Sequence, residues 1–515
     1  MTSLSFMTGA IVTQPGIPMR GKHAPEAVGI RLAGWQRAIS GNIRCKTMEE
    51  QVNLALRLAA ALFGCAYACI GAAQQPHIVY ILADDLGWKD VGYHGSPIRT
   101  PHLDKLAQGG ARLEKFYTLP YSTQTRAALM TGRYPMRYGL QTLSILPWSR
   151  YGLPADERML PQALKEAGYR TAMLGKWQLG HFKKEFWPTR RGFDSFYGSF
   201  NGEIDYFRKT DRIGEADWHR NERQVKEAGY VTTLLGREAA SLISGHDATT
   251  PLFLYLSFNA PQMPLQAPRE YLEMYRDIAD ETRRAYVAMV TALDDAIGAL
   301  TSALESKGMA ANTLIVFHSD NGGALPNKYA TGDGDVSKPA ADNGPFQDGK
   351  GGLHEGSMRV AAFAAWPGRI QPGVVAERIH VTDMYPTLLR VAGAKLEQKR
   401  RVDGIDQWAT IADGKPSARK EMLLAMEDSR GALLIENWKL IVYSRLPVRY
   451  ELFNIQDDPS EEDNRAEREP QRVQEMLARF NEYAWEMAPS LYLEDLLKPR
   501  KYDAPMYWGE NPVRP

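Results

Sequence analysis

Short runs of apolar, often β-branched residues alternate with amphipathic segments through most of the chain. Four of these runs predict buried strands, over 77–83, 170–174, 252–257 and 313–318. Apolar residues at helical spacing predict long helices between them, over 101–109 and 283–307. Strands that alternate with helices indicate an α/β fold with a large, mostly parallel, doubly wound sheet flanked by helices. In such sheets the loops at the carboxyl ends of the strands form the site.

The pattern changes after about residue 400, where shorter strands follow one another closely. These are predicted over 422–425, 431–436, 438–444 and 450–453, and an amphipathic helix follows over 469–485. We therefore expect a smaller C-terminal antiparallel sheet with one helix packed on it, and an irregular wrapping tail over 486–515. The predicted organisation is an N-terminal extension over 1–75, an α/β domain over 76–415, and an α+β subdomain with its tail over 416–515.

An apolar, uncharged stretch, LAAALFGCAYACIGAA, lies over 58–73. Its length and small-residue end are typical of the hydrophobic core of a secretory signal peptide, and it is short for a membrane span. We predict a signal peptide over 48–73 with Met48 as the true start. The alternative is a buried apolar helix. Export predicts a periplasmic or secreted protein with no stable membrane anchor after cleavage.

The composition is that of an ordinary globular protein, with 44% hydrophobic and 24% charged residues among 515. A formal net charge of +1 excludes an overall basic field for nucleic acid. Cys45, Cys65 and Cys69 all precede the first predicted strand, so no disulfide framework is available to the rest of the chain.

Two polar pairs follow predicted strands directly. Asp84 and Asp85 end one strand, and Asp320 and Asn321 end another, so both pairs are expected at the same edge of the sheet. Either pair alone is more often a turn or a helix cap. Together, their oxygen atoms indicate a site for a hard cation such as Ca²⁺ or Mg²⁺ and not for zinc.

The segment STQTRAALMTG over 122–132 resembles the sulfatase signature, C-x-P-x-R with a glycine six residues after the arginine, in which the cysteine is oxidised to formylglycine. Seven further segments between 76 and about 486 look like sulfatase segments in the family's order, and so does a C-terminal one: VYILADDLGWKDVGYHG, PHLDKLAQGGARLEKFY, TRAALMTGRYPMRYGLQ, LKEAGYRTAMLGKW, PTRRGFDSFYG, SDNGG, GKGGLHEGSMRV and YELFNIQDDPSEEDN. The resemblance is to the arylsulfatase B type, which acts on N-acetylgalactosamine 4-sulfate. It implies an alkaline phosphatase-like fold.

The resemblance also implies roles for single residues. It makes Asp84, Asp85, Asp320 and Asn321 the calcium ligands. It places Ser122 at the nucleophile, held by Arg126, and has Lys176 and Lys350 bind the oxygens of the transferred group. Fixed positive charge around a tetrahedral anion suits that chemistry. The implied partner is a small-molecule or oligosaccharide sulfate ester.

The chain departs from the family pattern at three positions. Ser122 replaces the cysteine, while Gln178 and Gln262 replace two histidines. Glutamine forms hydrogen bonds but cannot give up a proton near neutral pH. His354 is our candidate for a replacement acid, with His181 and His318 as alternatives, although a lone histidine is more often structural.

Four interpretations follow. The first is a metal-dependent sulfuric ester hydrolase that acts on a sulfated carbohydrate or an aryl sulfate. In it, Ser122 is either unmodified or converted to formylglycine by a maturation enzyme. Gln124, at the signature's proline position, argues against that conversion. In the second, Ser122 attacks phosphorus in a phosphoester. The third is cleavage without a covalent intermediate. The fourth is a catalytically silent protein that binds sulfated glycans.

Overall fold

A computed structural model describes residues 74–325, 340–498, 507–508 and 511–512. The chain divides into two units, Met1–Ala72 and Ala73–Pro515, and all the described residues belong to the second. The predicted signal peptide over 48–73 lies outside the described residues.

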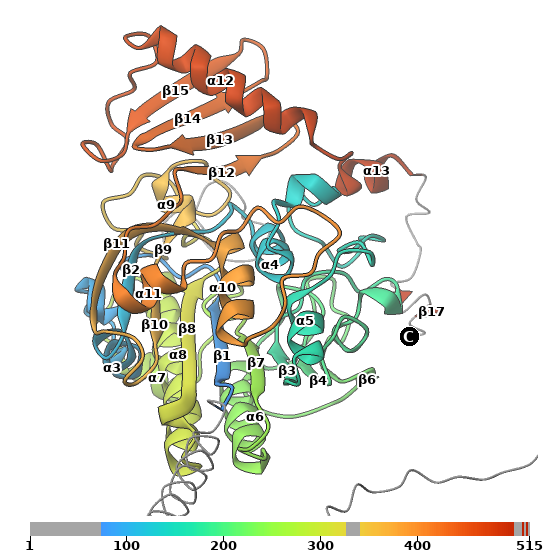
Figure 1. The fold of residues 1–515 in the computed structure, drawn as a ribbon. Helices are drawn as coiled ribbons and strands as arrows, with labels where there is room; N and C mark the ends of the chain where they lie inside the picture. Colours follow the sequence, from blue (N-terminus) through green and yellow to red (C-terminus); the bar gives the residue numbers. More distant parts are fainter. Residues whose placement is uncertain (1–73, 326–339, 499–506, 509–510, 513–515) are drawn as a thin grey trace, which may run out of the picture. The chain divides into compact units, whose positions relative to one another are not determined.

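An eleven-stranded sheet forms the centre of the second unit (Figure 1). Strand β1 (His77–Ala83) lies between β8 (Thr313–Ser319) and β7 (Leu252–Ser257) and is parallel to both, and β3 (Arg170–Gly175) follows β7. These four strands confirm the four predicted runs. The remaining strands of the sheet are β2 (Ala111–Tyr117), β4 (Ser195–Gly198), β5 (His219–Arg220), β6 (Arg223–Gln224), β9 (Arg359–Val360), β10 (Ala362–Ala365) and β11 (Gly373–His380). The strand order across the sheet is β11-β2-β10-β8-β1-β7-β3-β4-β5-β6, and β9 pairs with β2.

Strand β10 interrupts the parallel arrangement, because it runs antiparallel to both β8 and β2. The sequence pattern did not indicate it. Its four residues are all buried, and so short an apolar run has no periodicity that separates a strand from a helix turn.

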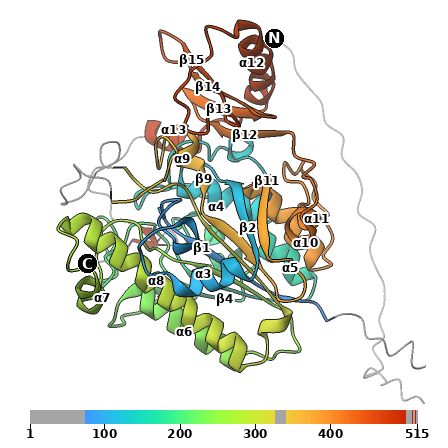
Figure 2. The same ribbon diagram turned by 90° about the vertical axis from the view of Figure 1, so that its left-hand side faces the viewer.

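Helices cover both faces of this sheet, so alternate residues of β1 enter two different cores. Val79 and Ile81 pack with α3 (Pro101–Gln108), α6 (Val231–Gly245) and α8 (Glu281–Ser306) on one face (Figure 2). Tyr80 and Leu82 pack on the other face with α4 (Ser122–Thr131), α5 (Leu160–Glu166), α10 (Met384–Val391) and α11 (Trp408–Asp413). A further helix, α7 (Arg269–Met274), contacts α8.

Helix α8 is long and apolar enough to cross a membrane by length and composition, and no other helix among the described residues is. Its apolar window has a mean hydropathy of 1.4 and is 78% buried within the protein. Burial of this kind is what a core helix shows.

The predicted C-terminal sheet is confirmed, with four antiparallel strands: β12 (Glu421–Met426), β13 (Arg430–Ile435), β14 (Trp438–Tyr443) and β15 (Arg449–Asn454). One face packs on α12 (Pro470–Trp485), where Leu433, Leu440 and Phe480 belong to one apolar cluster. The other face packs on the large domain, where Leu434 and Ile441 join Tyr117, Leu353 and Met358 in one apolar cluster. Met358 is the last residue of the short helix α9 (Glu355–Met358), and Leu353 precedes that helix.

The expectation of an irregular tail over 486–515 is wrong for part of it. Helix α13 (Leu491–Leu497) forms after Ser490, whose side chain accepts a hydrogen bond from the backbone N–H of Leu493, as a helix N-cap does. Asp495 pairs with Arg150 at 2.9 Å. Farther on, β16 (Tyr507–Trp508) pairs with β17 (Asn511–Pro512). Short 3₁₀ helices occupy several loops: Gly92–His94, Pro135–Tyr138, Lys184–Phe186, Pro188–Arg190, Ala310–Asn312 and Val381–Asp383.

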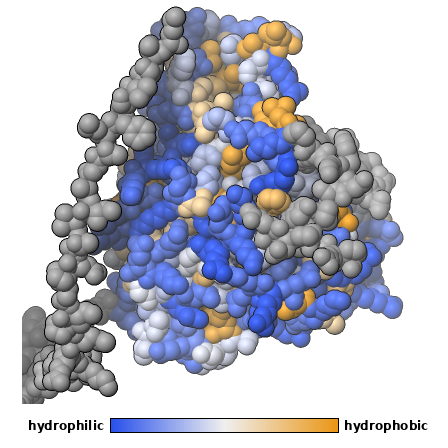
Figure 3. Space-filling model, turned by 90° about the vertical axis from the view of Figure 1, so that its right-hand side faces the viewer, coloured by the Kyte–Doolittle hydropathy of each residue, from blue (hydrophilic) through white to orange (hydrophobic). Residues whose placement is uncertain are grey.

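The described surface is largely polar on the face shown in Figure 3, where hydrophobic residues gather only in separate patches. Scattered exposed apolar residues are normal for a globular domain and indicate no particular partner.

Candidate active site

The two acidic strand ends lie side by side. Strands β1 and β8 are parallel with Ala83 opposite Ser319, so the next residues, Asp84 and Asp320, leave the sheet together. Oxygen atoms of Asp84, Asp85 and Asp320 all lie within 4.8 Å of one another, and each of these residues is at most 4% exposed. Asn321 joins them, because its amide donates to Asp85 Oδ1 at 2.7 Å.

These side chains fit a hard cation. The donors are all oxygen atoms, and Asp84 Oδ1 is buried with no hydrogen-bond partner among the described residues. Burial, together with the neighbouring Asp320, raises the pKa of Asp84 to about 7. Asp85 takes a φ of +62°, a left-handed conformation that costs free energy for a non-glycine residue. The unpartnered oxygen and raised pKa of Asp84 and the strained backbone of Asp85 lie in one place. A bound cation would give that oxygen a partner and stabilise the carboxylate charge.

Ser122 begins α4 beside this cluster. Its hydroxyl donates to Asn321 Oδ1 at 3.3 Å, and the residue is fully buried. The adjacent Thr123 donates to the carbonyl of Gln178 at 3.2 Å, which ties the helix start to the loop after β3. A helix N-terminus carries partial positive charge, so Ser122 lies where a developing anion is stabilised.

Arg126 lies one turn farther along the same helix. Its Nη2 is 3.0 Å from both Asp84 Oδ2 and Asp320 Oδ2, and the guanidinium is completely buried. Burial favours protonation of a carboxyl, but Arg126 and the site lysines outweigh it and hold the pKa of Asp320 below its usual value. Arg126 thus bridges the two strand ends through their carboxylates.

Lys176 and Lys350 approach the cluster from separate loops. Lys176 donates to Asp84 Oδ2, and to Gln262 Oε1 at 2.9 Å. Lys350 Nζ lies 2.8 Å from the Asp85 carboxylate. Burial lowers the pKa of Lys176, whereas at Lys350 the attraction of Asp85 outweighs burial and raises the pKa.

Gly175 allows Lys176 to reach the site. Its φ is +97°, and a Cβ placed there would lie 1.9 Å from the carbonyl oxygen of Ser257 on β7. Any other residue would therefore push the loop away from β7.

Both glutamines that stand where the resemblance implies histidines lie at this centre. Gln262 contacts Lys176, as above, and Gln178 lies near it, because a Cβ on Gly202 would come within 3.0 Å of the side chains of both Lys176 and Gln178. Gln178 takes a φ of +52°, and its buried Oε1 has no partner among the described residues. An unpartnered buried amide is available to bind a ligand.

His354 lies in a different environment. Its Nε2 is 3.1 Å from Glu451 Oε2, and its Nδ1 is 3.4 Å from Asp348 Oδ2. Burial lowers its pKa, but the two carboxylates outweigh that effect and raise it to about 9. This geometry favours an ion-pair role over that of a proton donor at Ser122.

The two alternative histidines make internal contacts. His181 Nε2 lies 2.8 Å from the carbonyl of Pro147, and burial lowers its pKa. His318 bonds the Tyr80 hydroxyl and the Ser319 carbonyl, each at 2.7 Å, and burial lowers its pKa to about 4.

The sequence analysis missed two asparagines at the site. Asn259 donates to the carbonyl of Gly202 at 2.9 Å, and the polar side-chain atoms of Asn201 are buried without partners among the described residues. A single asparagine in a loop is typical of a turn, so the sequence carried no signal for either.

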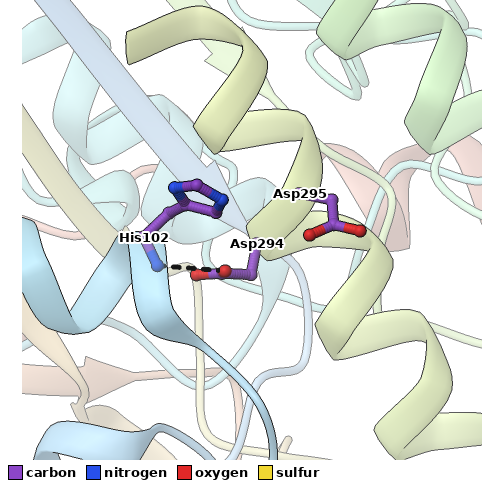
Figure 4. A group of neighbouring side chains, drawn as sticks. All are labelled: His102, Asp294 and Asp295. Atoms are coloured by element: carbon purple, nitrogen blue, oxygen red, sulfur yellow. Dashed lines mark hydrogen bonds between the residues drawn. The ribbon is translucent and has the colours of Figure 1, made fainter. Parts of the chain in front are cut away.

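A second acidic group, His102 with Asp294 and Asp295, has a structural explanation (Figure 4). Asp294 on α8 accepts the backbone N–H groups of His102 and Leu103 at 3.1 and 2.7 Å, so it caps the first turn of α3. Asp295 accepts the hydroxyl of Tyr271 at 2.9 Å.

The chain is similar to known proteins in sequence and in fold. The family described as Sulfatase matches residues 76–394, and N-sulphoglucosamine sulphohydrolase, C-terminal, matches 346–485. The chain is 36% identical to arylsulfatase J of Mus musculus, in an alignment that covers 81% of this chain and 77% of that protein. It is 34% identical to arylsulfatase A of Homo sapiens, where the alignment covers 69% of this chain and 71% of that protein. The crystal structure of Ps i-CgsB in complex with k-i-k-neocarrahexaose superposes with a TM-score of 0.73 at 32% identity, covering 82% of this chain and 98% of that one. The chain belongs to the sulfatase family of hydrolases.

Proposed function

We propose that the protein is a metal-dependent sulfuric ester hydrolase that acts on an aryl sulfate or a sulfated carbohydrate. The observation that carries the proposal is the convergence of Asp84, Asp85, Asp320 and Asn321 with the Ser122 hydroxyl, which lies 3.3 Å from Asn321 in a buried centre.

The charges at this centre favour an anionic substrate. Three carboxylates face three cationic side chains, Arg126, Lys176 and Lys350, so the protein groups alone come close to balance. A divalent cation held by Asp84, Asp85, Asp320 and Asn321 would add two positive charges. The net positive charge would then attract the sulfate ester and stabilise charge on its oxygens.

The chain's own residues support a two-step reaction at sulfur. In the first step the Ser122 oxygen attacks sulfur and its proton passes to water, while the bond between sulfur and the ester oxygen breaks. The ester oxygen leaves as an anion and takes a proton from water to give the alcohol. In the second step water attacks the sulfur of the sulfated serine, so sulfate departs and the hydroxyl is regenerated. Lys176 and Lys350 hold the sulfate oxygens through both steps.

Formylglycine at position 122 is the alternative form of the nucleophile. Its hydrate has two hydroxyls, so one can attack sulfur while the other expels sulfate and regenerates the aldehyde. Gln124 stands where the family signature has proline, and its amide donates to the carbonyl of Gln141 at 2.6 Å. We therefore favour unmodified Ser122, and a loss of two hydrogens from the peptide containing it, seen by mass spectrometry, would reverse that choice.

The glutamines at the site bear on the leaving group. Gln178 and Gln262 cannot protonate a departing oxygen, so leaving groups that are stable as anions, such as phenols, are favoured. The names of the relatives still support sugar substrates. One of them, N-acetylgalactosamine-6-sulfatase of Mus musculus, is 36% identical to this chain over 67% of its length. We expect Ca²⁺ to fill the site, with Mg²⁺ as the alternative, and a periplasmic or secreted location.

A phosphoester hydrolase is the second candidate, because an unmodified serine is itself a competent nucleophile toward phosphorus. Assays with matched aryl sulfate and aryl phosphate, on the wild type and Ser122→Ala, separate the candidates. The proposal predicts sulfate ester turnover that Ser122→Ala abolishes. Turnover of phosphate alone would favour the second candidate, and turnover of neither would favour a glycan-binding protein.

A further inference from the structure

The loop that carries Lys350 is fastened to the C-terminal sheet by side chains from three of its strands. On β13, Arg430 Nη2 donates to the carbonyl of Gly351 at 2.8 Å. On β15, Glu451 contacts His354, and on β14, the fully buried Lys439 lies 3.1 Å from Glu355. Every one of these loop residues lies within five positions of Lys350.

Gly351 also connects this loop to the nucleophile. Its N–H donates to the carbonyl of Pro120 at 2.9 Å, two residues before Ser122. Arg430 reaches the hydroxyl of Tyr121 as well, at 3.4 Å. The single guanidinium therefore contacts the residue before Ser122 and the residue after Lys350.

Arg430 is itself held in place. Its Nε and Nη2 lie 2.9 and 3.1 Å from the two carboxylate oxygens of Glu427, which is a bidentate pair. Glu427 and Arg430 also close the β12–β13 turn, where the Glu427 N–H donates to the Arg430 carbonyl at 2.8 Å. Nη2 thus serves both Glu427 and the Gly351 carbonyl, so the pair with Glu427 fixes the plane from which Nη2 donates to the loop.

We infer that Arg430 is a positioning residue for the reaction at Ser122: through Gly351 and Tyr121 it sets the separation of Lys350 from Ser122. The C-terminal sheet thereby takes part in the active site without contributing a group that touches the substrate. This inference rests on the proposed function for its effect on turnover, but its effect on the loop does not.

The matched pair of variants is Arg430→Gln and Arg479→Gln. Arg479, on α12, forms the same kind of bidentate pair with Glu421, at 2.8 Å for both contacts, and also reaches Tyr483. Arg479 also pairs with Glu482, and these partners lie on β12 and α12, so this variant reports the loss of an arginine and its ion pairs away from the Lys350 loop. Arg430→Lys keeps the charge and removes the fork, and serves if Arg430→Gln fails to fold.

Hydrogen exchange gives the readout that is independent of turnover. In Arg430→Gln, or in Arg430→Lys, the amides of residues 349–355 should exchange about tenfold faster than in the wild type, because the loop loses a charge-assisted hydrogen bond. Arg479→Gln should leave them unchanged. Equal exchange in all the variants would overturn the inference, even if the protein proved to be no sulfatase.

Turnover gives the second readout, through a double-mutant cycle with Lys350→Met. Alone, Arg430→Gln should lower kcat/KM for an aryl sulfate about 10- to 100-fold, mainly in kcat, as displacing an oriented group does. In the Lys350→Met background the same change should cost much less, because the residue that it positions is gone. Equal losses in both backgrounds would contradict the inference. Absence of wild-type turnover would count against the proposed function alone, and the exchange result would still decide the positioning role.

Discussion

At the residue scale, the site differs from its family at the groups that move protons. Serine and two glutamines stand where the resemblance leads us to expect a cysteine-derived aldehyde and two histidines, and the candidate replacement acid, His354, is ion-paired. The carboxylates, the arginine and the lysines that the resemblance implies are present. The residues expected to bind the sulfate group are therefore different from those that would protonate the leaving group. Single substitutions can test each function separately.

Gln262→His should restore a proton donor beside Lys176. We expect kcat/KM to rise about 100-fold for sulfates of poorly acidic alcohols, and little for nitrophenyl sulfate, because general acid catalysis matters most for poor leaving groups. The measurement is kcat/KM across sulfate esters of graded leaving-group acidity. Gln266→His is the control, since Gln266 contacts Asp205 and the Tyr206 N–H and not Lys176. A uniform rise across the series would contradict the assignment.

His354 should make stability depend on pH. Its folded pKa of about 9 exceeds the ordinary 6.5, so its stabilisation is complete below about pH 6.5 and is lost as pH rises through 9. The free energy of unfolding of the wild type should fall by roughly 3 kcal/mol relative to His354→Gln across that interval. Urea unfolding at several pH values measures this. Parallel pH profiles for the two proteins would rule the ion pair out as the source, and an altered pH profile of turnover at constant stability would revive His354 as an acid.

At the element scale, strands and helices with strong periodicity were predictable and the site's finer contacts were not. Strand β7 matches its predicted run residue for residue, and the ends of β1 and β8 gave the acidic cluster correctly, because parallel strands deliver their next residues to one edge. The short antiparallel strand β10 and helix α13 were not predicted, because neither is long enough to show a hydrophobic periodicity. The roles of His354 and Asn259 depend on partners 60 to 100 positions away, which one sequence does not reveal.

The interface between β14 and the large domain contains a buried ion cluster that should matter for stability. Lys439 lies 3.1 Å from Glu355 and 2.8 Å from Glu461, and none of the three side chains is exposed to more than a trace. Lys439→Met leaves the buried Glu461 without this cation and leaves Glu355 with Arg359, 3.7 Å away, so we expect a loss of about 3 to 5 kcal/mol. Denaturant unfolding tests this. Adding Glu461→Gln should recover part of the loss, and an unchanged midpoint in Lys439→Met would show that the cluster contributes nothing.

At the scale of the whole molecule, segments from across the described chain meet at one centre. Strand ends near 84 and 320, a helix start at 122, and loops at 176 and 350 supply the charged groups, and the C-terminal sheet fastens the last of these loops. These groups come together only in the completed fold, because each element holds side chains of a neighbouring element in place. We therefore expect catalysis to depend on a cation that gathers these groups.

Removal and return of that cation is the most direct test. Protein treated with a chelator should lose aryl sulfate turnover, and Ca²⁺ should restore it with one ion per chain, while Asp320→Asn should weaken the restoration because one ligand charge is missing. Full turnover by rigorously metal-free wild-type protein would contradict the account at its centre.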